Sequence, residues 1–169
     1  KKVADLLGIL YLDTGAMYRA FTYYVIAKKV DLDNTSNIEK LLESFNLSMS
    51  EDSVVLNGAD ITSEIRRENV TTNVSYISSI GFVRKKMVEL QREIGENRSV
   101  VAEGRDIGTV VFPETKYKFY IDASIDERAH RRIGDNNNQS KITDINEIKQ
   151  KIRQRDEYDS TRKISPLTK

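Results

Sequence analysis

The chain repeats one order of features: a short apolar run, a polar turn, and a longer segment with helical spacing. Apolar runs of the kind found in buried strands occupy residues 9–12, 99–102 and 118–121. Segments 16–28 and 83–94 carry apolar residues at the spacing of a helix packed on one face. Strands that alternate with helices predict a parallel sheet, because a parallel connection needs a crossover. We therefore expect an α/β fold in three layers, with helices flanking a parallel sheet.

Capping residues indicate where the shorter helices begin and end. Residues 1–7 have the pattern of part of an amphipathic helix that Gly8 ends. Ser36 and Glu39 form a capping box ahead of a second amphipathic stretch over 38–45. Both features predict short helices, one before and one after the first long helix.

The insert and the C-terminal third are marked by turn and capping residues. Residues 47–60 alternate and contain the turn pair Asn57-Gly58, which predicts a small β-excursion. A capping box of Ser124 and Glu127 opens a helix through Arg132, followed by a polar loop over 134–138. The last helix is expected to begin near residue 143 or 144 and to turn three isoleucines inward: Ile145, Ile148 and Ile152.

Composition excludes several classes of protein. With 169 residues, 38% hydrophobic and 31% charged, the chain suits one soluble globular domain. Its 27 basic and 26 acidic side chains leave a net charge of +1, so no general field attracts nucleic acid or an acidic membrane. There is no cysteine for a disulfide or a thiolate metal site, and no apolar run approaches the roughly 18 residues of a membrane span. We expect a cytoplasmic protein that binds any anion at a local site.

The first polar cluster, Asp13 to Arg19, directly follows an expected strand. A helix N-terminus there offers free N–H groups, and Arg19 adds a bidentate donor for phosphate oxygens. The alternative is that Asp13 or Thr14 only caps the helix while Arg19 is a solvated charge. Tyr18, with the other tyrosines of this helix, is expected to pack rather than to stack on a base.

The second cluster, Glu103 to Thr109, follows another expected strand. Glu103 and Asp106 flank Arg105, and two glycines allow close approach of the backbone to a ligand. These residues suit a site that binds phosphate and orders the water shell of a metal ion. The alternative is a structural ion pair in a turn.

The third cluster lies near the end of the chain. Arg155, Asp159 and Arg162 fall at i, i+4 and i+7, so one helix face presents them together, with Arg153 and Asp156 nearby. Such a face can bind phosphate and a ribose hydroxyl, or it can be a solvated helix stabilised by ion pairs. An earlier helix repeats the arginine pattern with Arg128, Arg131 and Arg132.

One expected device is absent from these residues. Phosphoryl transfer from ATP uses a loop such as G-x-x-x-x-G-K-[ST], yet no glycine in the sequence is followed by lysine. The residues by themselves indicate an arginine-rich α/β protein that binds a phosphorylated small molecule.

Four strings resemble the bacterial cytidylate kinase family in order and spacing. They are LDTGAMYR at 12–19, EGRDIGTVVFP at 103–113, ERAHRR at 127–132 and RDEYDSTR at 155–162, and the closing Ser165-Pro166-Leu167 also matches. The resemblance covers essentially the whole chain. It implies a P-loop nucleoside monophosphate kinase fold, in which the β-excursion is the CMP-binding insert.

The resemblance implies a kinase that moves the γ-phosphoryl group of ATP to CMP or dCMP with Mg²⁺. The residues implied around the CMP phosphate are Thr14, Arg19, Arg105 and Arg162. Those implied at the cytosine edge are Ser75, Arg84 and Asp106, and Arg155 with Asp159 would hold the ribose. Glu103 would order Mg²⁺-bound water, with no direct metal ligand, and the catalytic charges would come from Arg128, Arg132 and Arg155, with Arg131 also bordering the lid.

The same resemblance predicts one incomplete kinase domain, with the CMP-binding region at about 30–95 and the lid at about 128–160. A family member would begin about twenty residues earlier, with the phosphate loop, and would continue past Pro166. We expect a truncated or partly represented form of a complete enzyme. The alternative is a non-catalytic fragment that binds CMP.

Other functions remain open on the residues alone. An RNA-binding module would use the arginine clusters, although the near-neutral charge argues against it. A kinase for AMP, UMP or shikimate is a further possibility. The family resemblance favours a monomer that binds only small nucleotides.

Overall fold

The parallel sheet predicted from the apolar runs is present. The computed structural model describes residues 1–50, 52–136 and 144–169. In it, β1 (Leu10–Asp13) pairs in parallel with β5 (Val100–Glu103), in a register that sets Asp13 opposite Glu103. Two polar side chains that end strands ninety residues apart in the sequence therefore lie at the same edge of the sheet. The α/β class is confirmed.

Helices flank this sheet and supply most of the core. Before the insert lie α1 (Lys2–Leu7), α2 (Thr14–Ala27), α3 (Thr35–Leu41) and the 3₁₀ turn η1 (Leu42–Ser44). After it come η2 (Glu64–Arg66), α4 (Glu68–Ser79), α5 (Gly81–Gly95) and the π-type turn η3 (Ile107–Val111), and the chain closes with α6 (Ile125–Asn136) and α7 (Ile145–Thr161). α1 ends at Gly8, which has a φ of 62° as predicted for a C-cap glycine.

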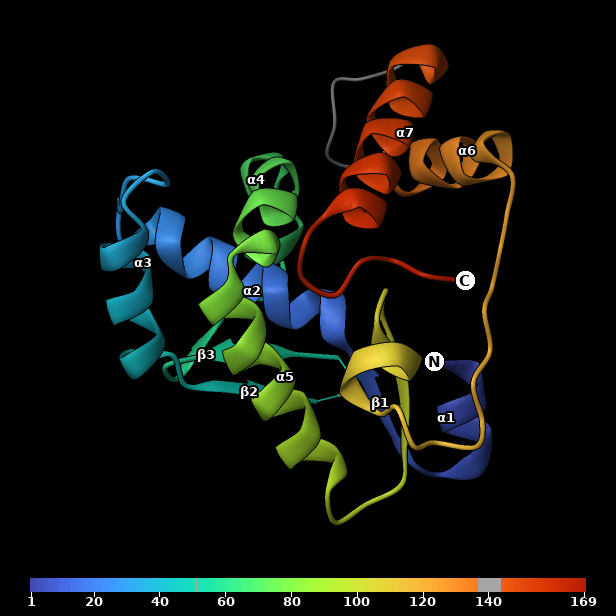
Figure 1. Cartoon of the computed structure of the whole chain (residues 1–169), viewed down its shortest axis with the longest axis horizontal. Coiled ribbons are helices and arrows are strands. Elements are labelled where there is room, and N and C mark those ends of the chain that lie inside the picture. Colours follow the sequence, from blue (N-terminus) through green and yellow to red (C-terminus); the bar gives the residue numbers. More distant parts are fainter. Residues whose placement is uncertain (51, 137–143) are drawn as a thin grey trace.

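A single apolar core joins α2, α4, α5 and the insert. Its largest fully buried members include Phe21, Leu12, Met17, Ile38, Ile77 and Met87. Ile77 and Met87 come from α4 and α5, which Figure 1 shows in front of α2. Burial of these side chains stabilises the body that carries the strand ends.

The predicted β-excursion is a three-stranded antiparallel sheet. β2 (Leu47–Met49) pairs with β3 (Val54–Leu56), and β3 pairs with β4 (Ala59–Asp60). Asn57 and Gly58 form the turn, with φ values of 49° and 83° that suit asparagine and glycine. Val54 and Leu56 belong to the common core, so the insert is packed onto the body.

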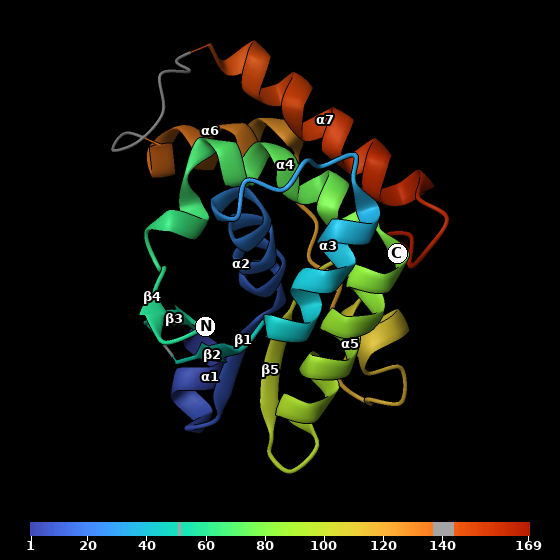
Figure 2. The same cartoon turned by 90° about the vertical axis from the view of Figure 1, so that its left-hand side faces the viewer.

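The helices α6 and α7 lie together across one end of the molecule, beyond α4 (Figures 1 and 2). Ala129 and Ile148 are buried, but among the described residues the main apolar core includes none from either helix. One hydrogen bond to the body runs from the Tyr158 hydroxyl to the Ser79 hydroxyl, 2.7 Å away. The predicted inward face of α7 is confirmed at Ile148 and is half-buried at the other two isoleucines.

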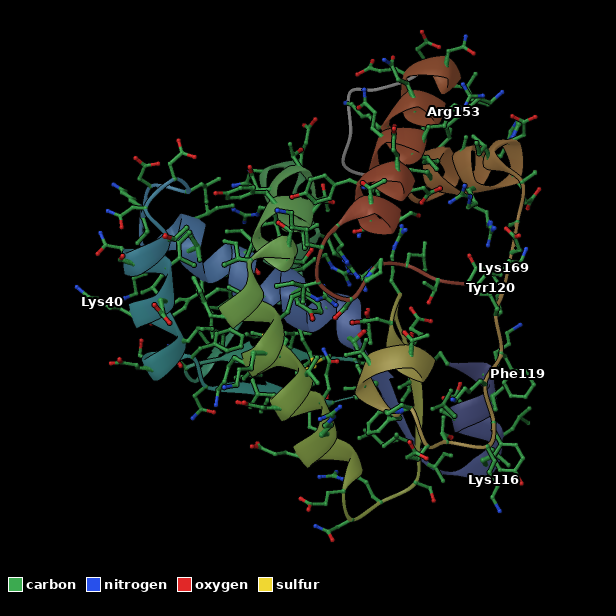
Figure 3. All side chains as sticks on the ribbon, viewed as in Figure 1. Lys40, Lys116, Phe119, Tyr120, Arg153 and Lys169 are labelled. Carbon is green, nitrogen blue, oxygen red and sulfur yellow. The ribbon has the colours of Figure 1, made fainter. Side chains whose placement is uncertain are left out.

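The strand predicted over 118–121 is wrong. This segment is extended but pairs with no described strand, and a strand exists only where a neighbour completes its hydrogen-bond ladder. Its side chains are correspondingly exposed, to 84% at Phe119 and 90% at Ile121. Figure 3 shows Tyr120 beside Lys169, whose ammonium lies 5.3 Å from the ring centroid. None of the described helices is long and apolar enough to span a membrane.

Three local predictions also need comment. The helix α3 is capped by Asn34, whose side chain accepts from the Asn37 N–H, and not by a box at Ser36, because the helix begins one residue before that serine. At α6 the Ser124 hydroxyl does accept from the Glu127 N–H at 3.1 Å, as predicted. The polar loop was expected to begin at 134, and this start is wrong because α6 runs on through residue 136. The rest of the expected loop lies outside the described residues.

Candidate functional site

At the junction of β1 and α2, the first cluster both caps the helix and presents a cation. Asp13 caps α2, since its carboxylate accepts from the Ala16 N–H at 2.8 Å. The same carboxylate pairs with Arg19 at 3.0 Å, so Arg19 is a fixed and largely buried cation and not a solvated one. A side chain at Gly15 would lie 3.1 Å from the Arg19 guanidinium, and glycine leaves that space open. The junction thus presents a guanidinium beside a helix N-terminus, an arrangement suited to an anion.

The turn after β5 closes on this junction. The Thr14 hydroxyl donates to the Glu103 carbonyl at 2.7 Å. Gly104 permits the approach, because a Cβ there would come within 2.3 Å of the Thr14 hydroxyl oxygen. Glu103 itself remains exposed at the end of the strand. The turn therefore places one exposed carboxylate at the sheet edge, beside Tyr11, while its backbone holds α2.

Asp106 and Arg84 form a buried ion pair across that turn. Their side chains are 5% and 3% exposed, and the Arg84 guanidinium also donates to the Ser78 carbonyl at 2.9 Å. The guanidinium lies over the Tyr18 ring, 5.3 Å from its centroid. Burial raises the pKa of Tyr18 to about 12, so its phenol stays neutral at physiological pH. Ser75 is half-buried on α4, one turn before Ser78.

Asp159 of α7 is the point at which three arginines meet. Its side chain is 4% exposed and contacts Arg105 at 3.1 Å, Arg162 at 3.1 Å and Arg155 at 3.8 Å. Asp156, one turn earlier, pairs with Arg105 at 3.0 Å. The third cluster is therefore joined to the second. The ion pairs of the alternative are present on this face, but Asp159 and Arg162 are buried and not solvated.

Positive charge exceeds negative charge around this aspartate. The pKa of Arg155 is held below its usual range, first by loss of water around the guanidinium and then by the charge of Arg105, although 46% of the side chain is exposed. Arg19 and Arg132 lower it further. The pKa of Arg162 is lowered in the same way, by burial and by Arg84. Repulsion among fixed cations favours a bound anion between them.

Helix α6 adds further positive charges beside Asp156. Arg128 pairs with Asp156 at 2.6 Å. Arg131 and Arg132 line, with Arg128, Ile121 and Ala123, a hollow of about 390 Å³. Three guanidinium groups around one hollow suit the phosphates of a nucleotide.

Several buried guanidinium nitrogens have no hydrogen-bond partner among the described residues. They are Arg19 Nε, Arg84 Nε, Arg128 Nε and Arg162 Nη2. A buried donor without a partner is rare, and a bound group that accepts from it is an ordinary explanation. These free donors fit phosphate oxygens.

The structure brings most of the predicted site residues together. Direct contacts connect Thr14 with the Glu103 backbone, Arg84 with Asp106, and Asp159 with its three arginines. The Ser75 side chain makes no hydrogen bond within the described part of the chain, and its predicted role stays a prediction. Sequence reasoning missed Gln91, which is fully buried on α5; a polar residue at a core position of an apolar helix face was the available signal.

A family model described as cytidylate kinase matches residues 1–169. The chain is 42% identical to a cytidylate kinase of Caldanaerobacter subterraneus, covering 99% of the chain and 75% of that protein, and 41% identical to one of Fusobacterium nucleatum, covering 100% and 78%. It is 43% identical to a bifunctional pantoate ligase/cytidylate kinase of Prochlorococcus marinus, of which it spans 34%.

Removing one partner of the buried Arg84–Asp106 pair should destabilise the folded protein far more than removing both partners. Asp106→Leu strands the Arg84 charge, and we expect a loss of about 3–5 kcal/mol in the free energy of unfolding. The double variant Asp106→Leu with Arg84→Met should lose distinctly less, because no charge is left unpaired. Urea unfolding of both variants checks this, and equal losses would contradict it.

The arginines around Asp159 should respond to added anion. Asp159→Asn removes the carboxylate that all three share, and we expect a loss of about 2–4 kcal/mol in the free energy of unfolding. Inorganic phosphate should restore part of that loss because it binds the folded state. Denaturant midpoints with and without phosphate test this, with Glu157→Gln, on the exposed side of α7, as the control. A variant that phosphate does not stabilise would overturn the idea of an anion site.

Proposed function

The chain belongs to the cytidylate kinase family, and we propose that it transfers the γ-phosphoryl group of ATP to CMP or dCMP. The observation that carries this proposal is the meeting of three arginines on Asp159 at the edge where β1 and β5 end. Ligands of open α/β sheets bind outside the carboxyl ends of the strands, which is where these charges gather. The family supplies the identity of the nucleotide.

The monophosphate is proposed to lie between three cations from separate elements: Arg19 of α2, Arg105 after β5 and Arg162 after α7. Thr14 would lie beside the phosphate at the helix N-terminus, where its hydroxyl fixes the turn after β5 by donating to the Glu103 carbonyl. The free Nε of Arg19 and the free Nη2 of Arg162 support this placement, since both are buried donors without partners in the described chain. Arg155 and Asp159 would hold the ribose.

The base is proposed to be read by Arg84, Asp106 and Ser75. A carboxylate accepts from the exocyclic amino group of cytosine, whereas uracil carries an oxygen at that position. The ion pair with Arg84 holds the Asp106 carboxylate in a fixed orientation. CMP is therefore favoured over UMP.

In the reaction, an oxygen of the CMP phosphate attacks the γ-phosphorus, and the bond to the β,γ-bridging oxygen of ATP breaks. The protein supplies position and positive charge and needs no nucleophile of its own. Arg128 and Arg132 would balance charge from the lid, with Arg131 at its border. Mg²⁺ would arrive with ATP and neutralise its phosphates. Glu103, which is exposed at the end of β5, is proposed to act on metal-bound water.

The remaining parts of the proposal concern the setting of the protein. We expect it to act as a cytoplasmic monomer with small nucleotides as its only partners. The near-neutral net charge of +1 supports the lack of a nucleic-acid partner.

The purified full-length protein should phosphorylate CMP in the presence of ATP and Mg²⁺, with AMP and UMP as parallel substrates. Selective turnover of CMP, followed as ADP release, is the expected result. Binding of CMP without turnover would support the alternative of a non-catalytic CMP-binding protein. If the protein shows neither CMP binding nor CMP turnover, the proposal is overturned.

Two arginines of α7 form a matched pair that tests whether a positioned positive charge contributes to catalysis. Arg155 faces Asp159, whereas Arg153 lies on the outer part of the helix (Figure 3). Arg155→Met should reduce kcat/KM for CMP by roughly 100-fold or more, because positioned cations stabilise the transferred phosphoryl group. Arg153→Met should leave it within about twofold. Steady-state kinetics decide, and equal effects at the two positions would contradict the assignment.

A further inference from the structure

The chain turns back on α7 directly after that helix ends (Figure 2). The Leu167 N–H donates to the Asp159 carbonyl at 2.8 Å, and the Arg162 N–H donates to the Tyr158 carbonyl at 3.1 Å. Two carbonyls of the last turn of α7 therefore gain partners from the residues that follow the helix. We call this hydrogen-bonded segment the 162–167 turn.

The 162–167 turn also packs on the body, at the junction between α4 and α5. Gly81 begins α5, and a Cβ there would come within 2.9 Å of Ile164 Cδ1, so the glycine leaves room for the isoleucine. The Tyr158 hydroxyl reaches the same junction, where it donates to the Ser79 hydroxyl at 2.7 Å. These contacts fix the position of the 162–167 turn relative to the body.

Ser165, within this turn, has a backbone conformation that serine rarely adopts. Its φ is 50°, in the left-handed region, where a side chain raises the free energy of the backbone. Pro166 follows, although the residue before a proline ordinarily adopts an extended backbone. The Ser165 hydroxyl makes no hydrogen bond within the described part of the chain, whereas its carbonyl accepts from Arg162 Nε at 2.7 Å. The unusual conformation therefore serves the carbonyl and not the side chain.

That carbonyl is one of two acceptors that hold the Arg162 guanidinium. The other is the Asp159 carboxylate, which accepts from Nη1 at 3.1 Å. A guanidinium held at one nitrogen can swing about that contact, whereas two acceptors fix the direction of its rigid, planar fork. The remaining nitrogen, Nη2, is buried without a partner among the described residues, and only 7% of the side chain is exposed. Arg162 is therefore left with one free donor that points in a fixed direction.

We propose that Ser165 is a positioning residue for phosphate binding: its carbonyl, brought to the guanidinium by the positive φ, orients Arg162 so that the free Nη2 donates to the CMP phosphate. The inference rests on the proposed function and deepens it, because it identifies what directs one of the three cations at the monophosphate. Ser165 touches no substrate and acts through its main chain. Its effect should therefore require both the phosphate of the nucleotide and the guanidinium of Arg162.

Substitutions at Ser165 separate the backbone conformation from the side chain. Glycine adopts a positive φ freely, whereas a branched Cβ strongly disfavours it, so Ser165→Gly should bind CMP within about twofold of the wild type. Ser165→Val should bind CMP roughly five- to tenfold more weakly, because a displaced carbonyl releases Arg162 Nε. Ser165→Thr keeps the hydroxyl but adds the branch, and its CMP affinity should also fall. Calorimetry on the full-length protein measures these affinities.

Two further measurements distinguish positioning from general damage to the fold. Cytidine lacks the phosphate, so its affinity, measured by displacement of CMP, should change less than about twofold in Ser165→Val or Ser165→Thr. In an Arg162→Met background, the same substitutions should cause no further loss of CMP affinity, because the two residues act as one unit.

Three results would overturn the inference while the proposed function stands. They are wild-type CMP affinity in both β-branched variants, equal losses for CMP and cytidine, and a further loss of CMP affinity in the Arg162→Met background. Failure of the wild-type protein to bind CMP would instead overturn the proposed function, and this inference with it.

Discussion

Ion pairs on Asp159 and Asp156 hold the two parts of this molecule together. The apolar core runs through α2, α4, α5 and the insert, and in the described chain it includes nothing from α6 or α7. Those two helices reach the body through Arg105, which contacts both aspartates, and through the Tyr158–Ser79 hydrogen bond. Exposed ion pairs contribute little, but Asp159 is nearly buried, so its contacts are the strong ones. The placement of α7 over the strand ends therefore depends on charge more than on apolar burial.

A contact made of ion pairs between α7 and the body suits a site that binds phosphate. The arginines that hold α7 are the same ones that lie at the sheet edge, and several of their nitrogens have no partner within the described residues. A phosphate placed there would satisfy these donors and relieve the repulsion that lowers the pKa of Arg155 and of Arg162. Substrate binding and the closing of α6 and α7 onto the body would then use one set of charges, which is the arrangement that excludes water during phosphoryl transfer.

Much of the fold could be predicted from local pattern. The strands β1 and β5, the long helices and the Asn57–Gly58 turn all follow from side-chain period and turn chemistry, which act over a few residues. The prediction of a strand over 118–121 was wrong because an apolar run becomes a strand only beside a partner strand. The prediction of a capping box at Ser36 was wrong because Asn34, two residues earlier, is an equally good cap and begins the helix sooner.

For the site, the sequence by itself determined which segments carry the chemistry: acid and arginine residues that follow strands, and an arginine face on the last helix. It could not show which charges meet, because those contacts join residues 22 positions apart at Arg84 and Asp106, and 51 apart at Arg105 and Asp156. Tertiary structure alone decided that Arg84 is buried against Asp106 rather than solvated, and that Gln91 is fully buried. The physical reason is that local pattern specifies the conformation of a segment, whereas the environment of a charged or polar group is set by whichever distant segments pack around it.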